Sequence, residues 1–64
     1  MVLDIEKVML AAAEKKMNWT EIRENTGIST VTIVRIQRGK PILMKTAGKL
    51  AEALGVKVAD LLKS

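Results

Sequence analysis

The side chains with the clearest capacity to bind a partner are basic and concentrated in one segment. Between Asn25 and Ala51 the chain carries five bases and no acid, whereas the other residues carry six bases and seven acids. The net charge of +4 therefore originates in this segment. Such a concentration of positive charge attracts a polyanion, most often a nucleic acid, although a solvated basic face without a partner is an alternative. The five bases are Arg35, Arg38, Lys40, Lys45 and Lys49.

The residue types that most catalytic and metal sites require are missing. The chain has no cysteine and no histidine, which excludes disulfides, thiolate ligands and imidazole chemistry. Glu21 and Glu24 fall within one helical turn, but no nucleophile–base pair or phosphate-cradling loop accompanies them. We interpret them as a solvated face. The sequence thus predicts no catalytic residue, no metal site and no cofactor.

Length and composition predict one small domain over residues 1–64, because no linker or internal repeat divides the chain. A domain of this size buries only roughly 60% of its extended surface, so self-association is an expected source of stability. No apolar run approaches the ~20 residues of a membrane span, and the N-terminal sequence lacks a basic region and a cleavage signature. We therefore expect a cytoplasmic protein without a membrane partner.

Glycine and proline positions divide the chain into four or five segments of helical length. The first helix is expected from an N-cap at Asp4 to about Lys16, with Leu10 pointing away from the core. Its predicted core face contains Ile5, Val8, Met9 and Ala12, with Ala11 at the edge.

A second helix is expected to begin at Asn18. Asn18 and Glu21 have the spacing of a capping box, in which each side chain binds the other residue's backbone N–H. Met17 and Ile22 have the spacing of a hydrophobic staple. Gly27 suits the left-handed conformation that ends a helix.

The next segment, STVTIVRIQRGK, contains conflicting signals. Six of its residues are β-branched, which favours a strand. Its apolar residues do not alternate, however, since Ile33 and Val34 are adjacent, whereas a helix places Ile33 and Ile36 on one side. With Ser29 as N-cap, we predict a helix over residues 29–38. Its opposite side should expose Val31, Val34, Arg35 and Arg38.

The C-terminal part predicts a fourth helix over about Met44–Leu54 and a short one over about Val58–Leu62. We expect Ile42 and Leu43, which precede the fourth helix without a polar cap, to be exposed unless a partner covers them. The expected architecture is all-α, a compact domain of four to five helices. The predicted core residues here are Met44, Ala47, Leu50, Ala51, Leu54, Val58, Leu61 and Leu62.

Five residues have the offsets of a helix-turn-helix, in which two helices pack at a steep angle around a tight turn. Read with IQRGK and LAEALGVKVADLL, they make the sequence resemble the phage repressor and Cro (Xre-like) helix-turn-helix family over about residues 5–62. The combination of GIS-x2-TI-x2-I-x-RGK with LAEALGV-x2-ADLL is fairly specific, whereas either half alone would be weak. The five residues are Ile22, Gly27, Ile28, Ile33 and Ile36.

The resemblance implies that the third helix lies in the major groove of double-stranded DNA. Arg35 and Arg38 could bind guanine O6 and N7 in a fork, and Val31 and Val34 could pack on thymine methyl groups. For the valines the alternative is an incompletely covered surface or a protein contact, and for the arginines it is solvation. The implied base-contacting residues are Ser29, Thr30, Val31, Val34, Arg35 and Arg38.

The resemblance also implies phosphate contacts on both sides of that helix. The N-terminus of the second helix offers N–H groups and a partial positive charge. The indole N–H of Trp19 could donate to a phosphate there, or Trp19 could be a packing residue that covers the staple. The implied phosphate-contacting residues are Asn18, Trp19, Lys40, Lys45, Thr46 and Lys49.

The sequence departs from the family at four positions. Trp19 replaces the usual Gln, and Arg23 replaces a small residue, so Arg23 must tilt outwards, where its charge could reach DNA, or widen the helix packing. A frequent Arg–Glu pair between the first and third helices is absent, because those positions hold Ala12 and Gln37.

These features together predict a sequence-specific transcriptional regulator, most simply a Cro-like repressor that acts by occupancy without a small-molecule effector. We expect a homodimer at least on DNA, with Ile42 and Leu43 and the tail around Val58 and Leu62 as candidate dimer surfaces. The alternative is a helical protein-interaction module, either an antitoxin-like or an adaptor subunit. Apolar residues expected at the surface motivate it: Leu10, Val31, Val34, Ile42 and Leu43.

Overall fold

Local side-chain chemistry sets where the first three helices begin, because Asp4, Asn18 and Ser29 each accept hydrogen bonds from the turn that follows. The computed structural model describes residues 1–63. Its helices are α1 (Ile5–Glu14), α2 (Trp19–Thr26), α3 (Thr30–Gln37) and α4 (Met44–Leu54), followed by the 3-10 helix η1 (Val58–Leu61). The predicted all-α class with four to five helices is confirmed.

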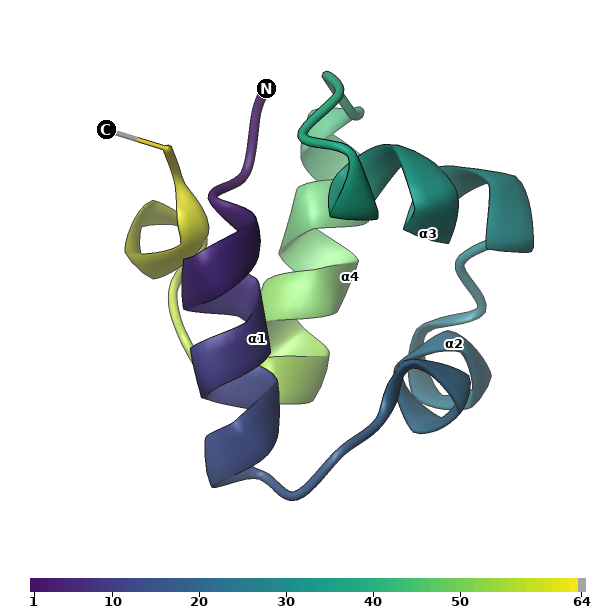
Figure 1. The fold of residues 1–64 in the computed structure, drawn as a ribbon, viewed down its shortest axis with the longest axis vertical. Coiled ribbons are helices and arrows are strands. Elements are labelled where there is room, and N and C mark those ends of the chain that lie inside the picture. Colours follow the sequence, from purple (N-terminus) through teal and green to yellow (C-terminus); the bar gives the residue numbers. More distant parts are fainter. Residues whose placement is uncertain (64) are drawn as a thin grey trace.

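The helices surround one aliphatic core. α4 packs against α2 and η1, η1 also contacts α1, and α2 contacts α3. In the view of Figure 1, α1 lies in front of the more distant α4, α2 and α3 lie on the right, and η1 lies on the left. Within residues 1–63, the outer side of α3 is therefore not covered by another helix. The largest fully buried side chains are Val8, Ile22, Ile36, Leu50, Leu54 and Leu61.

The buried face of α1 is rotated relative to the prediction. Val8, Ala11 and Ala12 are buried, whereas Met9 is 56% exposed and its assignment to the core was wrong. The face is centred on Val8, and Met9, one residue further, points about 100° away from that centre. The helix also ends at Glu14, short of the expected Lys16, which adopts a positive φ of 57°. Leu10 is exposed, as predicted.

The start of α2 and the turn after it follow the predicted local chemistry. The Asn18 side chain accepts from the Glu21 N–H at 2.8 Å, and the Glu21 carboxylate accepts from the Asn18 N–H at 3.1 Å. Gly27 ends the helix with a φ of 72°. The Thr26 hydroxyl also donates to the Ile22 carbonyl at 2.6 Å and accepts from the Ile28 N–H at 3.2 Å, which ties the turn to the helix before it. The sequence pattern had not indicated this role for Thr26.

Residues 30–37 form a helix despite their β-branched side chains. Ser29 is the N-cap, since the Thr32 N–H donates to its hydroxyl at 3.2 Å, and Arg38 is the C-cap. Ile33 and Ile36 are both buried in the core. A strand would place these two residues on opposite faces, so packing favours the helix over local propensity. The predicted helix over residues 29–38 is confirmed, with Ser29 as the predicted N-cap, when the two capping residues are counted as part of it.

The connection into α4 differs from the prediction at two residues. Ile42, expected at the surface, is only 9% exposed, because the loop turns inward and the Ile42 N–H donates to the Met1 carbonyl at 2.8 Å. Met44, expected in the core, is 74% exposed, and the buried residues of α4 begin only at Ala47. Leu43 is exposed and caps α4 without a side-chain hydrogen bond, as expected. Val58 and Leu62, expected in the core, are half-buried beside buried Leu61.

The N-terminal segment has a packing role that the sequence pattern did not reveal. Leu3 is buried and forms an isolated antiparallel bridge with Leu62. The Asp4 N–H donates to the Leu61 carbonyl at 2.8 Å, and the Lys7 ammonium donates to the Leu62 carbonyl at 3.0 Å. This segment therefore lies between η1 and the loop that carries Ile42. Among residues 1–63, none of the helices combines the length and apolarity needed to cross a bilayer.

Candidate nucleic-acid interface

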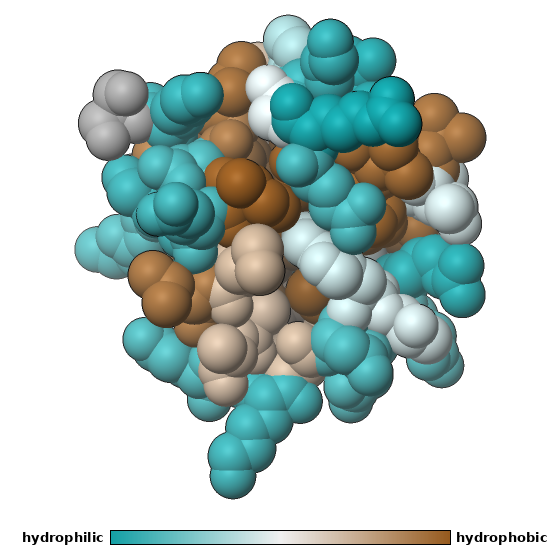
Figure 2. All heavy atoms as spheres, viewed as in Figure 1, coloured by the Kyte–Doolittle hydropathy of each residue, from teal (hydrophilic) through white to brown (hydrophobic). Residues whose placement is uncertain are grey.

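The outward side of α3 brings together most of the residues predicted to contact bases. Ile33 and Ile36 point into the core, so the residues between and beside them face outwards. Val31 is 72% exposed, and Figure 2 shows apolar surface over α3 bordered by hydrophilic side chains. A shallow hollow on this side is lined by Thr30, Val31, Val34, Arg35, Arg38 and Lys40.

At the start of α3, the two hydroxyl residues already have partners within the chain. Ser29 is exposed, and its hydroxyl donates to the Thr32 hydroxyl at 3.0 Å while it caps the helix. The Thr30 hydroxyl accepts from Nη1 of Arg23 at 3.1 Å. Each hydroxyl keeps additional hydrogen-bonding capacity, since a hydroxyl offers one donor and two acceptor sites.

The sequence left open whether Arg23 tilts outwards or widens the helix packing, and the structure places Arg23 at this surface. Its side chain is exposed and tilts outwards to reach Thr30. It lines a second hollow beside α3 with Trp19, Thr20, Thr30, Ile33, Val34 and Gln37. Arg23 is therefore a further cation at the candidate interface. The only sequence signal for it was a large residue at a position where the family carries a small one.

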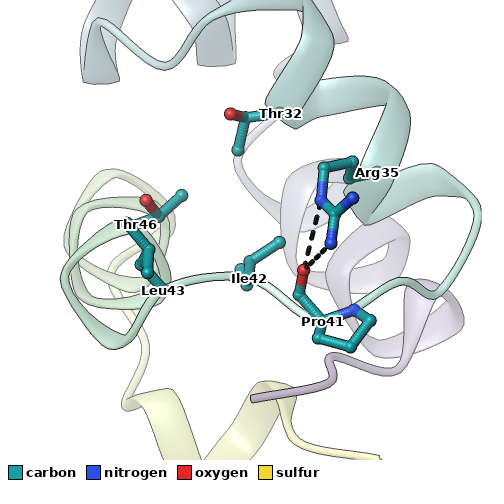
Figure 3. Close-up of a pocket in the computed structure, with 6 residues that line it drawn as sticks. All are labelled: Thr32, Arg35, Pro41, Ile42, Leu43 and Thr46. Atoms are coloured by element: carbon teal, nitrogen blue, oxygen red, sulfur yellow. Dashed lines mark hydrogen bonds between the residues drawn. The ribbon is translucent and has the colours of Figure 1, made fainter.

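Arg35 contacts the loop between α3 and α4. Its Nη2 donates to the Pro41 carbonyl at 2.7 Å and its Nε donates to the same oxygen at 3.3 Å. Figure 3 shows the guanidinium turned from α3 toward Pro41, next to a hollow lined by Thr32, Ile42, Leu43 and Thr46. Arg35 thus lies between the hollow on the outer side of α3 and the hollow beside α4.

The residues predicted to contact phosphates are more dispersed. Lys40 borders the outer hollow of α3, and Thr46 borders the hollow beside α4. Lys45 is exposed on the first turn of α4, next to Thr46. Lys49 lines a different hollow, formed with Asn25, Thr26, Glu52 and Ala53.

The two residues predicted at the start of α2 have structural contacts. Trp19 is half-buried and packs against the aliphatic core, in agreement with the packing alternative. It also borders the hollow next to Arg23, so part of the side chain is accessible from the surface. Asn18 is exposed, and its side-chain Oδ1 accepts the capping bond from the Glu21 N–H. Its side-chain NH2 group is the part that could reach a phosphate.

The charged side chains on α3 and in the loop that follows it are all basic. All five bases between residues 25 and 51 are exposed. Arg23 adds a further positive charge at the edge beside Thr30. Among residues 1–63, no group of three or more His, Cys, Asp or Glu side chains is arranged to hold a metal ion.

The chain belongs to the Cro/C1-type HTH DNA-binding domain family, since the model of that family matches residues 7–64. The resemblance to repressor and Cro proteins is thereby confirmed, and the chain is a DNA-binding domain of this class. A search of curated proteins found no match. A search of solved structures found none either.

Proposed function

We propose that this chain is a sequence-specific regulator of transcription, a Cro-like repressor that places α3 in the major groove of double-stranded DNA. The observation that carries the proposal is the outer side of α3. Ile33 and Ile36 anchor the helix in the core, so that valines and arginines project together from the opposite side. An α-helix fits the width of the major groove, where every base pair presents a distinct pattern of donors, acceptors and methyl groups.

The side chains on this surface differ in chemistry, and each kind suits a different base. Guanidinium groups of Arg35 and Arg38 bind guanine, and the exposed methyl groups of Val31 and Val34 contact thymine. Ser29 and Thr30, at the start of α3, supply hydroxyl groups to bases or to the adjacent backbone.

Phosphate contacts on either side of α3 would set its register on the duplex without reading sequence. Lys40, Lys45 and Thr46 lie near the α3–α4 loop, and Asn18 and Trp19 lie at the start of α2. Lys49 completes the proposed set from a more distant position on α4. Arg23 joins the set because its outward side chain carries charge to the same surface.

The experiment that tests the proposal is selection from a random duplex library, followed by salt titration of the selected sequences. We expect a defined consensus and an affinity that falls steeply with salt, because each neutralised phosphate contributes about −0.9 to the slope of log K against log salt. A repressor acting by occupancy would also lower transcription from a promoter that overlaps the consensus. Binding without sequence preference would contradict the proposal.

A second copy of the chain is proposed as a partner on DNA. Two recognition helices would then contact half-sites about one helical turn, roughly 34 Å, apart. Ile42 is buried and Val58 and Leu62 are half-buried, so the expected dimer surface is reduced to Leu43, with Met44, which is also strongly exposed, beside it.

A protein-interaction module of the same fold is the second candidate function. Leu10, Val31, Leu43 and Met44 are all strongly exposed and apolar, which favours a protein contact at one of these places. Salt discriminates the two functions, because an apolar protein interface would be nearly insensitive to ionic strength.

A further inference from the structure

The contact between Arg35 and Pro41 links a candidate base-reading side chain to a backbone group outside the recognition helix. Two N–H groups of the guanidinium, on Nε and Nη2, converge on the single carbonyl oxygen of Pro41 at 3.3 and 2.7 Å. Within residues 1–63, the side chain of Arg38 makes no hydrogen bond. The two arginines on the outer side of α3 therefore differ in how strongly the chain restrains them.

Both ends of this contact are anchored. Arg35 lies next to Ile36, which is fully buried, and its own carbonyl accepts from the Lys40 N–H at 2.9 Å. The pyrrolidine ring restricts the φ angle of Pro41. The residue that follows, Ile42, is buried and its N–H donates to the Met1 carbonyl at 2.8 Å. The Pro41 carbonyl is thus a fixed acceptor rather than one on a loosely held loop.

The hydrogen bonds leave a defined part of the guanidinium available. Nε–H and one N–H of Nη2 lie on the edge that faces Pro41. The N–H bonds of Nη1 and the second N–H of Nη2 form the outer edge, and a parallel pair of such bonds is the fork that guanine O6 and N7 accept.

We propose that Pro41 is a specificity-positioning residue, whose carbonyl holds Arg35 so that the outer edge of the guanidinium is presented to guanine. The inference rests on the DNA-binding function proposed above. A restrained arginine loses less rotamer freedom when it binds than an unrestrained one. Pre-orientation of this kind is worth about 2- to 10-fold in affinity, and it favours the base that matches the fork.

The first test examines the contact in the protein without DNA. Exchange of the side-chain Nε–H with solvent is measured by NMR for Arg35 and Arg38, which are both exposed arginines on α3 or at its end. We expect severalfold slower exchange at Arg35. Equal exchange rates at the two arginines would overturn the inference while leaving DNA binding untouched.

The second test is a double-mutant cycle on base discrimination. The base pair read by Arg35 is identified as the one whose preference is relaxed by Arg35→Ala. The affinity ratio between the selected duplex and one with that G·C pair replaced by A·T is then measured for the wild type, Pro41→Gly, Arg35→Ala and the double variant. Pro41→Gly should lower this ratio about 2- to 10-fold in the wild-type background and leave it unchanged in the Arg35→Ala background.

Controls separate positioning from folding and from the proposed function. Both variants keep the main-chain carbonyl, and Pro41→Ala adds less backbone freedom than Pro41→Gly, so it should give a smaller loss. Thermal unfolding establishes that each variant is folded at the assay temperature. If Pro41→Gly weakens both duplexes equally, Pro41 is only structural and the inference fails. If the wild type selects no sequence and its binding is insensitive to salt, the proposed function itself fails.

Discussion

Arg23 Nη1 donates to Thr30 Oγ1 over 3.1 Å, which joins the middle of α2 to the first residue of α3. The bond is solvent-exposed and spans the turn of the helix-turn-helix. Its position places a positive charge beside the N-terminal end of α3, the helix proposed to lie in the major groove. The contact therefore has a structural and an electrostatic consequence, which two substitutions can separate.

Arg23→Ala should cost little stability and a measurable amount of DNA affinity. We expect a loss of about 0.5 kcal/mol in the free energy of unfolding, the low end for a hydrogen bond, because the pair is exposed. Denaturant unfolding and fluorescence anisotropy with a labelled duplex measure the two effects. Thr30→Val removes the acceptor but keeps the Arg23 charge, so a phosphate role for Arg23 predicts a smaller salt slope for Arg23→Ala only.

Ile36→Ala and Val31→Ala should separate the two sides of α3. Ile36 is fully buried, and truncation there should cost about 2–5 kcal/mol and unfold much of this small domain. Val31 is 72% exposed, so its truncation should change unfolding by at most about 0.5 kcal/mol. Circular dichroism melts give the comparison. A large destabilisation by Val31→Ala would mean that this side chain is covered in solution.

Arg35→Ala and Lys45→Ala should affect DNA binding in different ways. Loss of a guanine fork should cost about 1–3 kcal/mol and relax one base preference, whereas loss of a phosphate contact should weaken all duplexes alike and reduce the salt slope by about 1. Competition binding against a panel of single-base variants distinguishes the two. If Arg35→Ala weakens binding to every duplex equally, Arg35 contacts the DNA phosphates and not a base.

Leu43→Lys should prevent self-association if Leu43 and Met44 form the proposed dimer surface. Both side chains are about three-quarters exposed, at 75% and 74%. A buried charge at their centre would oppose the contact. Sedimentation equilibrium of the wild type and the variant, with and without a two-half-site duplex, measures the stoichiometry. Leu10→Lys on α1 is the matched control. If Leu10→Lys prevents self-association and Leu43→Lys does not, the dimer interface lies on α1.

Gly27→Ala should destabilise the turn between α2 and α3 without creating a clash. A Cβ at this position would meet no atom within 4 Å, but the φ of 72° is strained for any residue with a side chain. We expect a cost of about 1 kcal/mol in the free energy of unfolding. Gly48→Ala, also in open space but on helical backbone, should be neutral or stabilising in the same denaturant titration.

Several features of the fold could be predicted because they depend on neighbours within one turn. The capping box of Asn18 and Glu21 and the N-cap at Ser29 each form across three residues. The left-handed Gly27 follows from the same short range of interaction. The outward side of α3 was predictable for a related reason, since burial of Ile33 and Ile36 determines the direction of every residue between them.

The other features of the fold depend on which segments of the chain pack against each other. Met9 is exposed because the buried face of α1 is centred on Val8, with Ala11 and Ala12 beside it, and Met44 lies outside the buried face of α4. Local periodicity gives the width of an apolar face but not its rotation against a partner helix. The roles of Leu3 and Ile42 could not be predicted either, since their contacts join residues that are far apart in the sequence.

From the sequence alone follow the starts of the first three helices, the end of α2 at Gly27, the helix-turn-helix offsets, the family and the basic segment. These features are encoded in residue types and short spacings. Tertiary structure alone decided that Met1 pairs with Ile42 across 41 positions, and that Arg35 turns onto the Pro41 carbonyl. Those contacts form only once α3, α4 and the N-terminal segment have packed, because only then do the donors and acceptors lie within hydrogen-bonding distance.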